Sequence, residues 1–436
     1  MNEAFRIERD TLGEVSVPSC RYYGAQTARA VQNFPISGVS IARLPRLLCA
    51  LAQVKIAAAM ANFDEGSLSR QKRDAIITAC REIVDGGLTS EFVVDVFQGG
   101  AGTSTNMNMN EVVANRAIEL LGGCRGDYRT FHPNDDVNRS QSTNDAYATA
   151  LRLSIVAASR EFQTDLASLS DALRRKANEF AAIRKLGRTQ LQDAVPMTLG
   201  QEFGAFATAV SEDCERLEEL EQLFLEVNLG GTAIGTGVAA GAIYRSRVLD
   251  HLRDLTGLPI VGARDLIEAS WDMGAFMLYA GMLKRTAAKL SKISNDLRLL
   301  ASGPFGGLGE IHLPALQPGS SLMPGKINPV AAEAINQVCF YVYGLETTIG
   351  MAAQAGQLQL NAMEPVIAYS LHQALFLLSQ ATKSFVRTCV DGIRPDIERC
   401  EANLAGSTAS ATELVGTIGY EAATRLVKES LSTNRA

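Results

Sequence analysis

Histidines and closely paired cysteines, the usual ligands of a zinc site, are scarce in this chain. It has 436 residues but only four histidines, none in an HExxH pair, and eight cysteines, no two of which form a CxxC pair. Zinc sites depend on such closely spaced ligands. The sequence therefore predicts no metal site. We expect the cysteines to be reduced and mostly buried, as in a protein of the cytosol.

Basic runs and nucleotide-binding loops are missing as well. The formal net charge is -6, and no run of Lys and Arg could neutralise a phosphate backbone, which excludes a nucleic-acid partner. No GxGxxG sequence occurs. Residues 319–329 superficially resemble a Walker loop. However, five residues separate Gly319 from Gly325, and Ile327 follows Lys326 where Ser or Thr is required, so a phosphate loop is excluded.

Apolar targeting segments are also lacking. The chain starts with MNEAFRIERD, which is charged and has no apolar core, so we expect no signal peptide. No uninterrupted apolar run reaches the length that spans a bilayer. The sequence predicts a cytoplasmic protein without a membrane partner.

Long amphipathic patterns are abundant from residue 141 onward. Between 201 and 228, apolar residues recur at steps of three and four, with Cys214 in one wider gap: Phe203, Phe206, Val210, Leu217, Leu220, Phe224 and Val227. This heptad pattern predicts a helix of roughly 42 Å, at ~1.5 Å per residue. Helices of similar length are predicted for 151–182, 265–301, 330–355 and 365–391.

Five long helices with short connections predict an elongated bundle. Several of them are apolar on more than one face and must be buried on several sides. Either one chain forms a thick bundle, or bundles from different subunits pack together, and we favour the second. The bundle defines a central domain at 141–391, between a mixed, mostly helical domain at 1–140 and a short helical domain at 392–436.

The flanking domains are less regular. Helices are predicted at 46–62 and 70–86 in the first domain, with loops at 95–110 and 122–138, and near 419–431 in the last.

Four polar segments stand out, and each has an ordinary structural explanation beside a functional one. Residues 99–108 combine glycines with hydroxyl and amide donors, which fits a ligand loop or a tight turn capped by Thr103 or Ser104. Residues 140–145 stand at a helix entry, which fits an anion site or simple capping. Residues 187–196 could be a surface turn, and residues 319–329 fit a loop that closes over a ligand.

Taken together, the four segments are rich in hydrogen-bond donors and poor in carboxylates and histidines. That combination favours an anionic ligand with several carboxylates rather than a metal, a nucleotide or a glycoside.

The segment GSSLMPGKINP at 319–329 closely resembles the GSSxMPxKxNP signature of the aspartase/fumarase superfamily. GTSTNMNMNE at 102–111, STNDAY at 142–147 and GRTQLQDAVPMTLGQE at 187–202 follow in the order of that family, and the resemblance runs from about residue 6 to about residue 431. It implies a mostly α, three-domain fold whose central bundles from four subunits form one helical core. It also implies a homotetramer with active sites shared between subunits.

Within the superfamily the sequence resembles aspartases more than class II fumarases. Gln190 stands where fumarases carry histidine, and Glu364 in NAMEPV stands where they usually carry lysine. The resemblance implies reversible anti-elimination of ammonia from L-aspartate to fumarate. It implies no cofactor, with a divalent ion at most a non-essential activator. A class II fumarase, a lyase for another substituted succinate and a non-catalytic structural homologue, as among lens crystallins, remain as alternatives.

The same resemblance assigns the candidate site residues. The predicted catalytic residues are Ser320, as the general base for the C3 proton, with Lys326 and Asn328 in the anion cradle. The predicted substrate-binding residues are Thr103, Ser104, Ser142, Thr143, Asn144, Thr189 and Gln190. Glu364 and Arg29 match family positions near the site.

Two features depart from the family pattern. Ala148 stands where a proline usually follows the STNDAY loop, which would loosen that helix entry. The sequence ends at Ala436, where family members usually continue for a few tens of residues, so we expect a shortened C-terminal domain.

Overall fold

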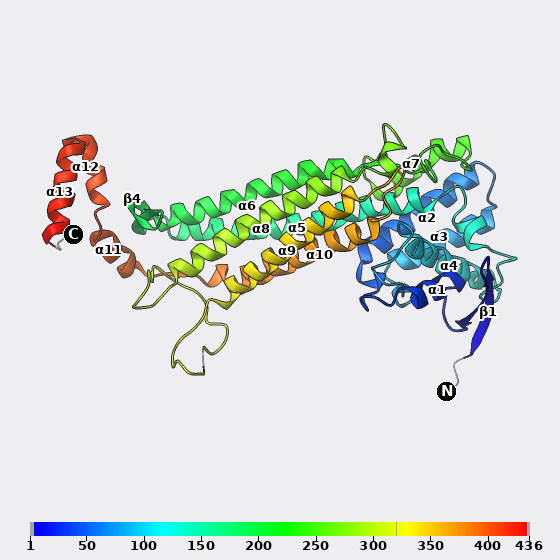
Figure 1. Ribbon diagram of the computed structural model, residues 1–436, viewed down its shortest axis with the longest axis horizontal. Coiled ribbons are helices and arrows are strands. Elements are labelled where there is room, and N and C mark those ends of the chain that lie inside the picture. Colours follow the sequence, from blue (N-terminus) through cyan, green and yellow to red (C-terminus); the bar gives the residue numbers. More distant parts are fainter. Residues whose placement is uncertain (1–3, 320, 434–436) are drawn as a thin grey trace. The chain divides into compact units, whose positions relative to one another are not determined.

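The computed structural model describes residues 4–319 and 321–433, and helices dominate it (Figure 1). The α-helices are α1 (Ala25–Asn33), α2 (Pro45–Asp64), α3 (Arg70–Val84), α4 (Thr103–Leu120), α5 (Thr143–Glu179), α6 (Leu199–Glu221), α7 (Ala242–Thr256), α8 (Gly274–Leu300), α9 (Val330–Gln354), α10 (Glu364–Thr388), α11 (Ile397–Ala405), α12 (Ser410–Ile418) and α13 (Tyr420–Thr433). The mostly helical fold class is confirmed.

The strands form small pairs within the described residues. β1 and β2, β3 and β4, and β7 and β8 pair antiparallel, whereas β5 and β6 pair parallel. Their bounds are β1 (Phe5–Asp10), β2 (Gly13–Pro18), β3 (Arg184–Thr189), β4 (Gln192–Thr198), β5 (Glu226–Val227), β6 (Val261–Gly262), β7 (Ile311–His312) and β8 (Arg394–Pro395).

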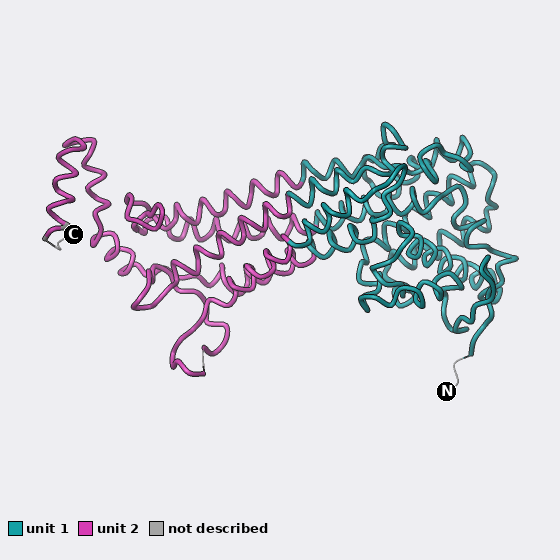
Figure 2. The backbone as a smooth tube through the Cα atoms, viewed as in Figure 1, with its two compact units in different colours: residues 1–160, 218–281, 344–375 teal, residues 161–217, 282–343, 376–436 magenta. Residues whose placement is uncertain are grey.

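The chain divides into two compact units, coloured separately in Figure 2. Unit 1 comprises residues 1–160, 218–281 and 344–375, and unit 2 comprises residues 161–217, 282–343 and 376–436. The long helices α5, α6, α8, α9 and α10 contribute a segment to each unit.

In unit 1, α2 packs against α3 and α7 and is buried along most of its length. By length and composition it could cross a membrane, which the sequence reading did not anticipate. However, its 18-residue apolar window is 72% buried inside the protein. It also buries Lys55 and Asn62, whose polar groups need partners away from lipid. We interpret α2 as a core helix.

Segments of the long helices complete unit 1. The hydroxyl of Ser154 on α5 lies 2.9 Å from Nε2 of His372 on α10. The guanidinium of Arg152, also on α5, lies over the ring of Phe276 on α8, 5.2 Å from its centroid. Phe224 packs on the same ring. These contacts bring α5, α8 and α10 together around a largely apolar interior.

In unit 2, segments of the long helices form a bundle. Ser170 on α5 donates to the Ala207 carbonyl on α6 at 2.9 Å, and Lys289 on α8 reaches Asp213 on α6 at 2.7 Å. Nδ2 of Asn336 on α9 donates to the hydroxyl of Ser291 on α8 at 2.8 Å. The bundle is therefore fastened by isolated polar contacts set in an apolar core.

Several predicted boundaries need correction. The helix expected at 201–228 ends at Glu221, because a 3-10 turn and strand β5 follow it. The helix expected at 265–301 begins only at Gly274. The loop expected at 95–110 ends where α4 starts at Thr103. The cysteines are free, but Cys20 and Cys124 are exposed, so burial holds for only part of the set.

Candidate active site

The predicted site residues fall into two groups, one in each unit. Unit 1 carries Thr103, Ser104, Ser142, Thr143 and Asn144. The other group, in unit 2, consists of Thr189, Gln190, Lys326 and Asn328. Ser320 lies outside the described residues.

The glycine-rich segment of unit 1 is a tight turn that runs directly into α4. Gly100, Ala101 and Gly102 all have left-handed backbone angles, with φ of 77°, 53° and 88°. The Thr103 hydroxyl donates to the Gly100 carbonyl at 2.6 Å and closes the turn. Gly102, rather than Thr103 or Ser104, is the helix N-cap, and no side chain caps it. Thr103 is exposed in this chain, so its hydroxyl oxygen can still accept or exchange partners.

Gly102 is required for space as well as for its backbone angle. A Cβ there would lie 2.7 Å from ring atoms of Tyr147 on α5. The Tyr147 ring therefore packs directly on the turn before α4, which fixes the first polar segment against the second. This contact explains why two loops far apart in sequence share one region of unit 1.

The second polar segment forms a capping box at the start of α5. The backbone N–H of Asn144 donates to the Ser142 hydroxyl at 3.2 Å, and the N–H of Ser142 donates to Oδ1 of Asp145 at 2.9 Å. Oδ2 of Asp145 accepts from the N–H groups of Gly230 and Thr232 at 3.0 and 2.9 Å. The helix capping expected for residues 140–145 is therefore present. The buried Asp145 also binds this segment to the loop after β5.

Asn144 is held on both sides by that same loop. Its Nδ2 donates to the Ala233 carbonyl at 2.8 Å, and its carbonyl accepts from Nδ2 of Asn228 at 3.0 Å. Asp145 and Asn228 anchor the helix entry at which Ala148 stands in place of the proline. The loosening expected from the missing proline stays a prediction.

Ser104 opens onto a cavity of about 690 Å³ in unit 1. Gln26, Arg29, Glu111 and Tyr128 also line it. The Arg29 guanidinium is already engaged, because its Nε and Nη2 donate to Asp10 at 2.7 and 3.0 Å. Arg29 therefore shares a cavity with a predicted site residue while it fastens the β1–β2 hairpin.

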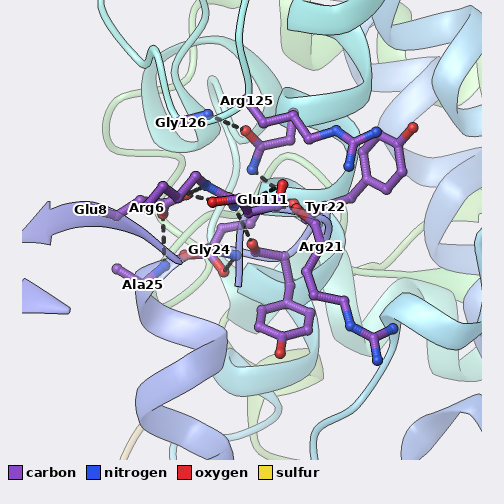
Figure 3. A network of polar contacts seen from close by, with 12 residues as sticks. Arg6, Glu8, Arg21, Tyr22, Gly24, Ala25, Glu111, Arg125 and Gly126 are labelled. Carbon is purple, nitrogen blue, oxygen red and sulfur yellow. Dashed lines mark hydrogen bonds and ion pairs between the residues drawn. The ribbon is translucent and has the colours of Figure 1, made fainter. Parts of the chain in front are cut away.

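Two buried carboxylates meet beside this cavity (Figure 3). Glu111 accepts from the backbone N–H of Gly24 at 2.8 Å, and Glu8 accepts from that of Ala25 at 2.8 Å. The Tyr128 hydroxyl donates to Glu8 at 3.0 Å. Burial raises the pKa of Glu111 to about 7, against the effect of its N–H donors. The carboxyl oxygens of Glu111 and Glu8 thus face the start of α1, where the helix dipole favours negative charge.

Glu364 is buried at the first residue of α10, with 1% of its surface exposed. Its Oε2 has no hydrogen-bond partner. Burial raises the pKa of Glu364 to about 8, although the charge of Arg152 opposes the shift. With a pKa of about 8, the Glu364 carboxyl holds its proton at neutral pH within the core of unit 1.

In unit 2, Thr189 and Gln190 stand at the exposed tip of the β3–β4 hairpin. Gln190 and Leu191 have φ of 55° and 63°, the left-handed pair of a two-residue turn. Asn and Gly are the usual residues in such turns, so Gln and Leu hold this geometry at some strain. The sequence allowed a surface turn in this segment, but the two paired strands on either side of the turn were not predicted.

A buried cluster of ion pairs anchors the β3–β4 hairpin. Glu310 is fully buried and accepts from Arg188 at 2.8 Å and from Nδ2 of Asn403 at 3.0 Å. Nζ of Lys185 lies 2.9 Å from its other oxygen. Burial alone would raise the pKa of Glu310, but the charge of Lys185 and the hydrogen bonds hold it below its ordinary value. A bulge between Gly187 and Arg188 turns Arg188 toward the cluster.

Lys326 and Asn328 stand in the segment 313–329, whose described residues form neither helix nor strand. Lys326 is exposed, and Asn328 is half-buried just before α9. A Cβ on Gly319 would lie 1.2 Å from the Lys326 carbonyl oxygen. Glycine is therefore needed at 319 because the two arms of the loop meet there, next to position 320.

Sequence reasoning missed the residues that support the site. Lys55 donates to Oδ1 of Asn138 and Oε1 of Gln141, both at 2.9 Å, and Asn106 donates to the Thr143 hydroxyl at 3.0 Å. A single lysine in the otherwise apolar stretch of α2 was a usable signal for Lys55. Nothing in the sequence points to Glu310 as a partner of Lys185.

Comparison with known proteins places the chain in a family. Residues 13–344 match a family described as a lyase. The aspartate ammonia-lyase of Pseudomonas canavaninivorans is 53% identical over 99% of this chain and 91% of its own length.

Two solved structures share the fold. One, described as a fumarate lyase:delta crystallin from Brucella melitensis bound to cobalt, matches with a TM-score of 0.97 and 54% identity over 99% of this chain and 94% of the other. The class II fumarase of Schistosoma mansoni matches with a TM-score of 0.95 and 36% identity over the same shares. Because the lyase family covers most of its length and these relatives match nearly the whole chain, the chain belongs to the aspartase/fumarase superfamily.

Proposed function

We propose that the protein is an aspartate ammonia-lyase, which converts L-aspartate reversibly to fumarate and ammonia. The observation that carries the proposal is the difference in identity between relatives. A named aspartate ammonia-lyase is 53% identical over nearly the whole chain, whereas the class II fumarase is 36% identical over an equal share. Gln190, at the exposed hairpin tip, supports the same choice, because fumarases carry histidine at the matching position.

The reaction removes a weakly acidic C3 proton and then expels ammonia. The carbanion delocalises into the neighbouring carboxylate, which becomes a dianionic aci-carboxylate. A second negative charge on one carboxylate requires many preorganised donors. The hydroxyls and amides gathered at the starts of α4 and α5 have this character, and so does the Lys326 ammonium.

Ser320 takes the C3 proton in this scheme. A free hydroxyl is too weak an acid to be ionised at neutral pH, so the closed loop must stabilise its alkoxide by backbone N–H groups and the Lys326 charge. Lys326 and Asn328 bind a substrate carboxylate. Thr103, together with Ser104 and the remaining predicted substrate-binding residues, orients the two carboxylates and the amino group.

We further propose a homotetramer with shared active sites. Large apolar side chains on the long helices are exposed in the single chain: Phe340 59%, Met351 62% and Phe376 61%. Burial of such side chains against other subunits would remove them from water. Lys326 and Thr189 are also exposed, which leaves them accessible to residues of a neighbouring subunit.

The chemistry needs a base, an acid and hydrogen-bond donors, so no cofactor is required, and a divalent ion would act at most as a non-essential activator. We place the enzyme in the cytoplasm, with a small dicarboxylate as its substrate and with neither nucleic acid nor membrane as a partner.

The test is to supply the purified protein with L-aspartate and, separately, with L-malate, and to follow fumarate by its ultraviolet absorbance. We expect rapid fumarate formation from aspartate only. Formation from malate only would identify a fumarase and overturn the proposal. A folded tetramer that is silent on both would also overturn it and would point to another substituted succinate.

A further inference from the structure

Lys55 is a fully buried lysine in the apolar core helix α2. Its Nζ donates to Oδ1 of Asn138 at 2.9 Å and to Oε1 of Gln141 at 2.9 Å. Removing a lysine amine from water is costly unless its hydrogen bonds are replaced. Both replacements belong to the segment that leads into Ser142 and Thr143. The Lys55 amine therefore anchors that segment. Because the amine is buried, it cannot contact a ligand.

The orientation of both amides is fixed independently of the lysine. Nε2 of Gln141 donates to the carbonyls of Val137 and Arg139 at 3.0 and 3.1 Å, so its oxygen must face Lys55. Nδ2 of Asn138 donates to the Gln141 carbonyl at 3.3 Å, so its oxygen also faces Lys55. Two N–H groups of the Lys55 amine satisfy both oxygens.

The Asn138 oxygen then fixes the orientation of Asn106. This side chain of α4 is buried and faces Oδ1 of Asn138 at 3.2 Å. Two amide oxygens would repel each other there, so Asn106 must present its NH2 group. The second hydrogen of that group donates to the Thr143 hydroxyl oxygen at 3.0 Å.

This contact fixes which way the Thr143 hydroxyl can donate its hydrogen. Its hydroxyl has one hydrogen to donate, and Asn106 cannot accept it because a donor group faces it. The hydroxyl hydrogen of Thr143 must therefore point away from Asn106, toward the other groups at the start of α5. For a carboxylate ligand, a hydroxyl oriented as a donor is the useful orientation, because a carboxylate only accepts.

We propose that Lys55 and Asn106 are positioning residues that orient the Thr143 hydroxyl as a hydrogen-bond donor to a substrate carboxylate. The inference rests on the proposed function, which supplies the carboxylate. It assigns a task to a hydrogen-bonded chain of four side chains, Lys55 to Asn138 to Asn106 to Thr143, of which only the last touches substrate.

The sharpest test is Asn106→Asp, which keeps the shape but reverses the polarity. Whether the new carboxyl is ionised or donates its O–H to Oδ1 of Asn138, it presents an oxygen that Thr143 can donate to. The Thr143 hydroxyl would then donate inward and be lost to the substrate. We expect kcat/KM for L-aspartate to fall by about 100-fold, in line with a lost hydrogen bond to a charged group that strengthens in the transition state.

A double-mutant cycle separates positioning from general damage. In a Thr143→Ala background the hydroxyl is already gone, so adding Asn106→Asp should change kcat/KM by less than about threefold. A loss of equal size in both backgrounds would overturn the proposal, and so would full activity of Asn106→Asp alone. Lys55→Met should give a smaller loss, with the same dependence on Thr143. Thr143→Ser should restore most of the activity that Thr143→Ala loses.

Lys72→Met is the matched control. Lys72 binds Asp136 at 2.7 Å, in the same stretch of chain, but has no link to Asn138 or Thr143. It should keep kcat/KM within about twofold, and circular dichroism should show that every variant is folded. If wild-type protein forms no fumarate from aspartate, the proposed function fails. If wild type is active and the cycle is additive, only the positioning role fails.

Discussion

The backbone N–H of Gly24 donates to Oε2 of Glu111 at 2.8 Å, and α1 starts beside this contact. Glu8 approaches the same point and accepts from the N–H of Ala25 (Figure 3). Glu8 also accepts from the Tyr128 hydroxyl. Two carboxylates from distant parts of the chain thus serve the free N–H groups of one short helix. The arrangement leaves no room for a side chain at position 24.

We predict that Gly24→Ala destabilises the protein by about 2–4 kcal/mol, since it overpacks the site and separates charged hydrogen-bond partners. The φ of Gly24 is -123°, so alanine could adopt the backbone angle, and the effect is purely steric. The added Cβ would lie 2.5 Å from both Glu8 Oε2 and the Tyr128 hydroxyl. Chemical denaturation at a fixed subunit concentration measures the loss.

Gly416→Ala serves as the comparison for Gly24→Ala. It lies within α12, and no atom stands within 4 Å of a new Cβ. Alanine is the better helix former, so this variant should be neutral or more stable by about 0.5–1 kcal/mol. An equal loss in both variants would contradict the steric explanation for Gly24.

Glu310→Gln should destabilise the protein in a pH-dependent way. The folded state holds the pKa of Glu310 below its ordinary value of 4.5, so its ionised form stabilises the fold above that pH. This contribution disappears as the pH falls through the folded pKa. We expect a loss of about 3–5 kcal/mol at pH 7, because Lys185 and Arg188 lose a buried partner. The difference from wild type should shrink below pH 4.5.

Glu202→Gln is the control for Glu310→Gln. Glu202 also pairs with Lys185, at 2.5 Å, but its side chain is 21% exposed and it is not bonded to Arg188. We expect a loss of about 1 kcal/mol or less. A difference between wild type and Glu310→Gln that stays constant down to pH 3 would show that the carboxylate charge is not what holds the hairpin.

Periodic features of the sequence were predictable because they arise from local spacing. The helices α5, α9 and α10 were located to within a few residues at most ends, since their apolar stripes repeat over many turns. The start of α4 was hidden by its polar residues, Thr103 and Ser104, which also suit a loop. The β3–β4 hairpin was missed because Gln190 and Leu191 are unusual in a left-handed turn.

The support of the site could not be predicted in the same way. Lys55 and Asn138 are 83 positions apart, and Lys185 meets Glu310 across a still larger separation in sequence. Such pairs depend on how helices pack, which no local pattern records. The residues that a ligand would touch were proposed from a resemblance, whereas the residues that orient them emerged only from three-dimensional contacts.

Ser320→Ala should reduce turnover of L-aspartate by about 10²–10⁴-fold, the usual contribution of a general base. The reason is chemical, because alanine offers no oxygen to take the C3 proton. Steady-state fumarate production measures the effect. Ser321→Ala provides a neighbouring hydroxyl as control and should stay within a few-fold of wild type. Retention of most activity by Ser320→Ala would remove the assigned base.

Lys326→Ala should raise KM for L-aspartate, and it should also lower kcat because the same charge stabilises the Ser320 alkoxide. Its ammonium is exposed in the single chain and would be recruited to a substrate carboxylate when the loop closes. An increase of about 10–100-fold corresponds to the loss of one charge-assisted hydrogen bond. Saturation curves over a wide range of aspartate concentrations give KM and kcat separately. Unchanged saturation behaviour would argue against any contact with the substrate.

Phe340→Glu should prevent assembly while leaving the single chain folded. Phe340 lies on the long helix α9 with 59% of its surface exposed, beside Tyr341 at 51%. If four bundles form a common core, each copy of the variant would bury a charge against apolar neighbours, at a cost of several kcal/mol per subunit. Light scattering with size-exclusion chromatography would then report monomers or dimers, and activity would fall with the shared sites.

Phe305→Glu tests whether that effect is specific to the bundle. Phe305 is 94% exposed and stands in a loop, so a charge there should leave the tetramer and its activity intact. A Phe340→Glu variant that remains tetrameric would place the subunit interface elsewhere. A variant that is monomeric yet fully active would contradict shared active sites, because each chain would then hold a complete site within itself.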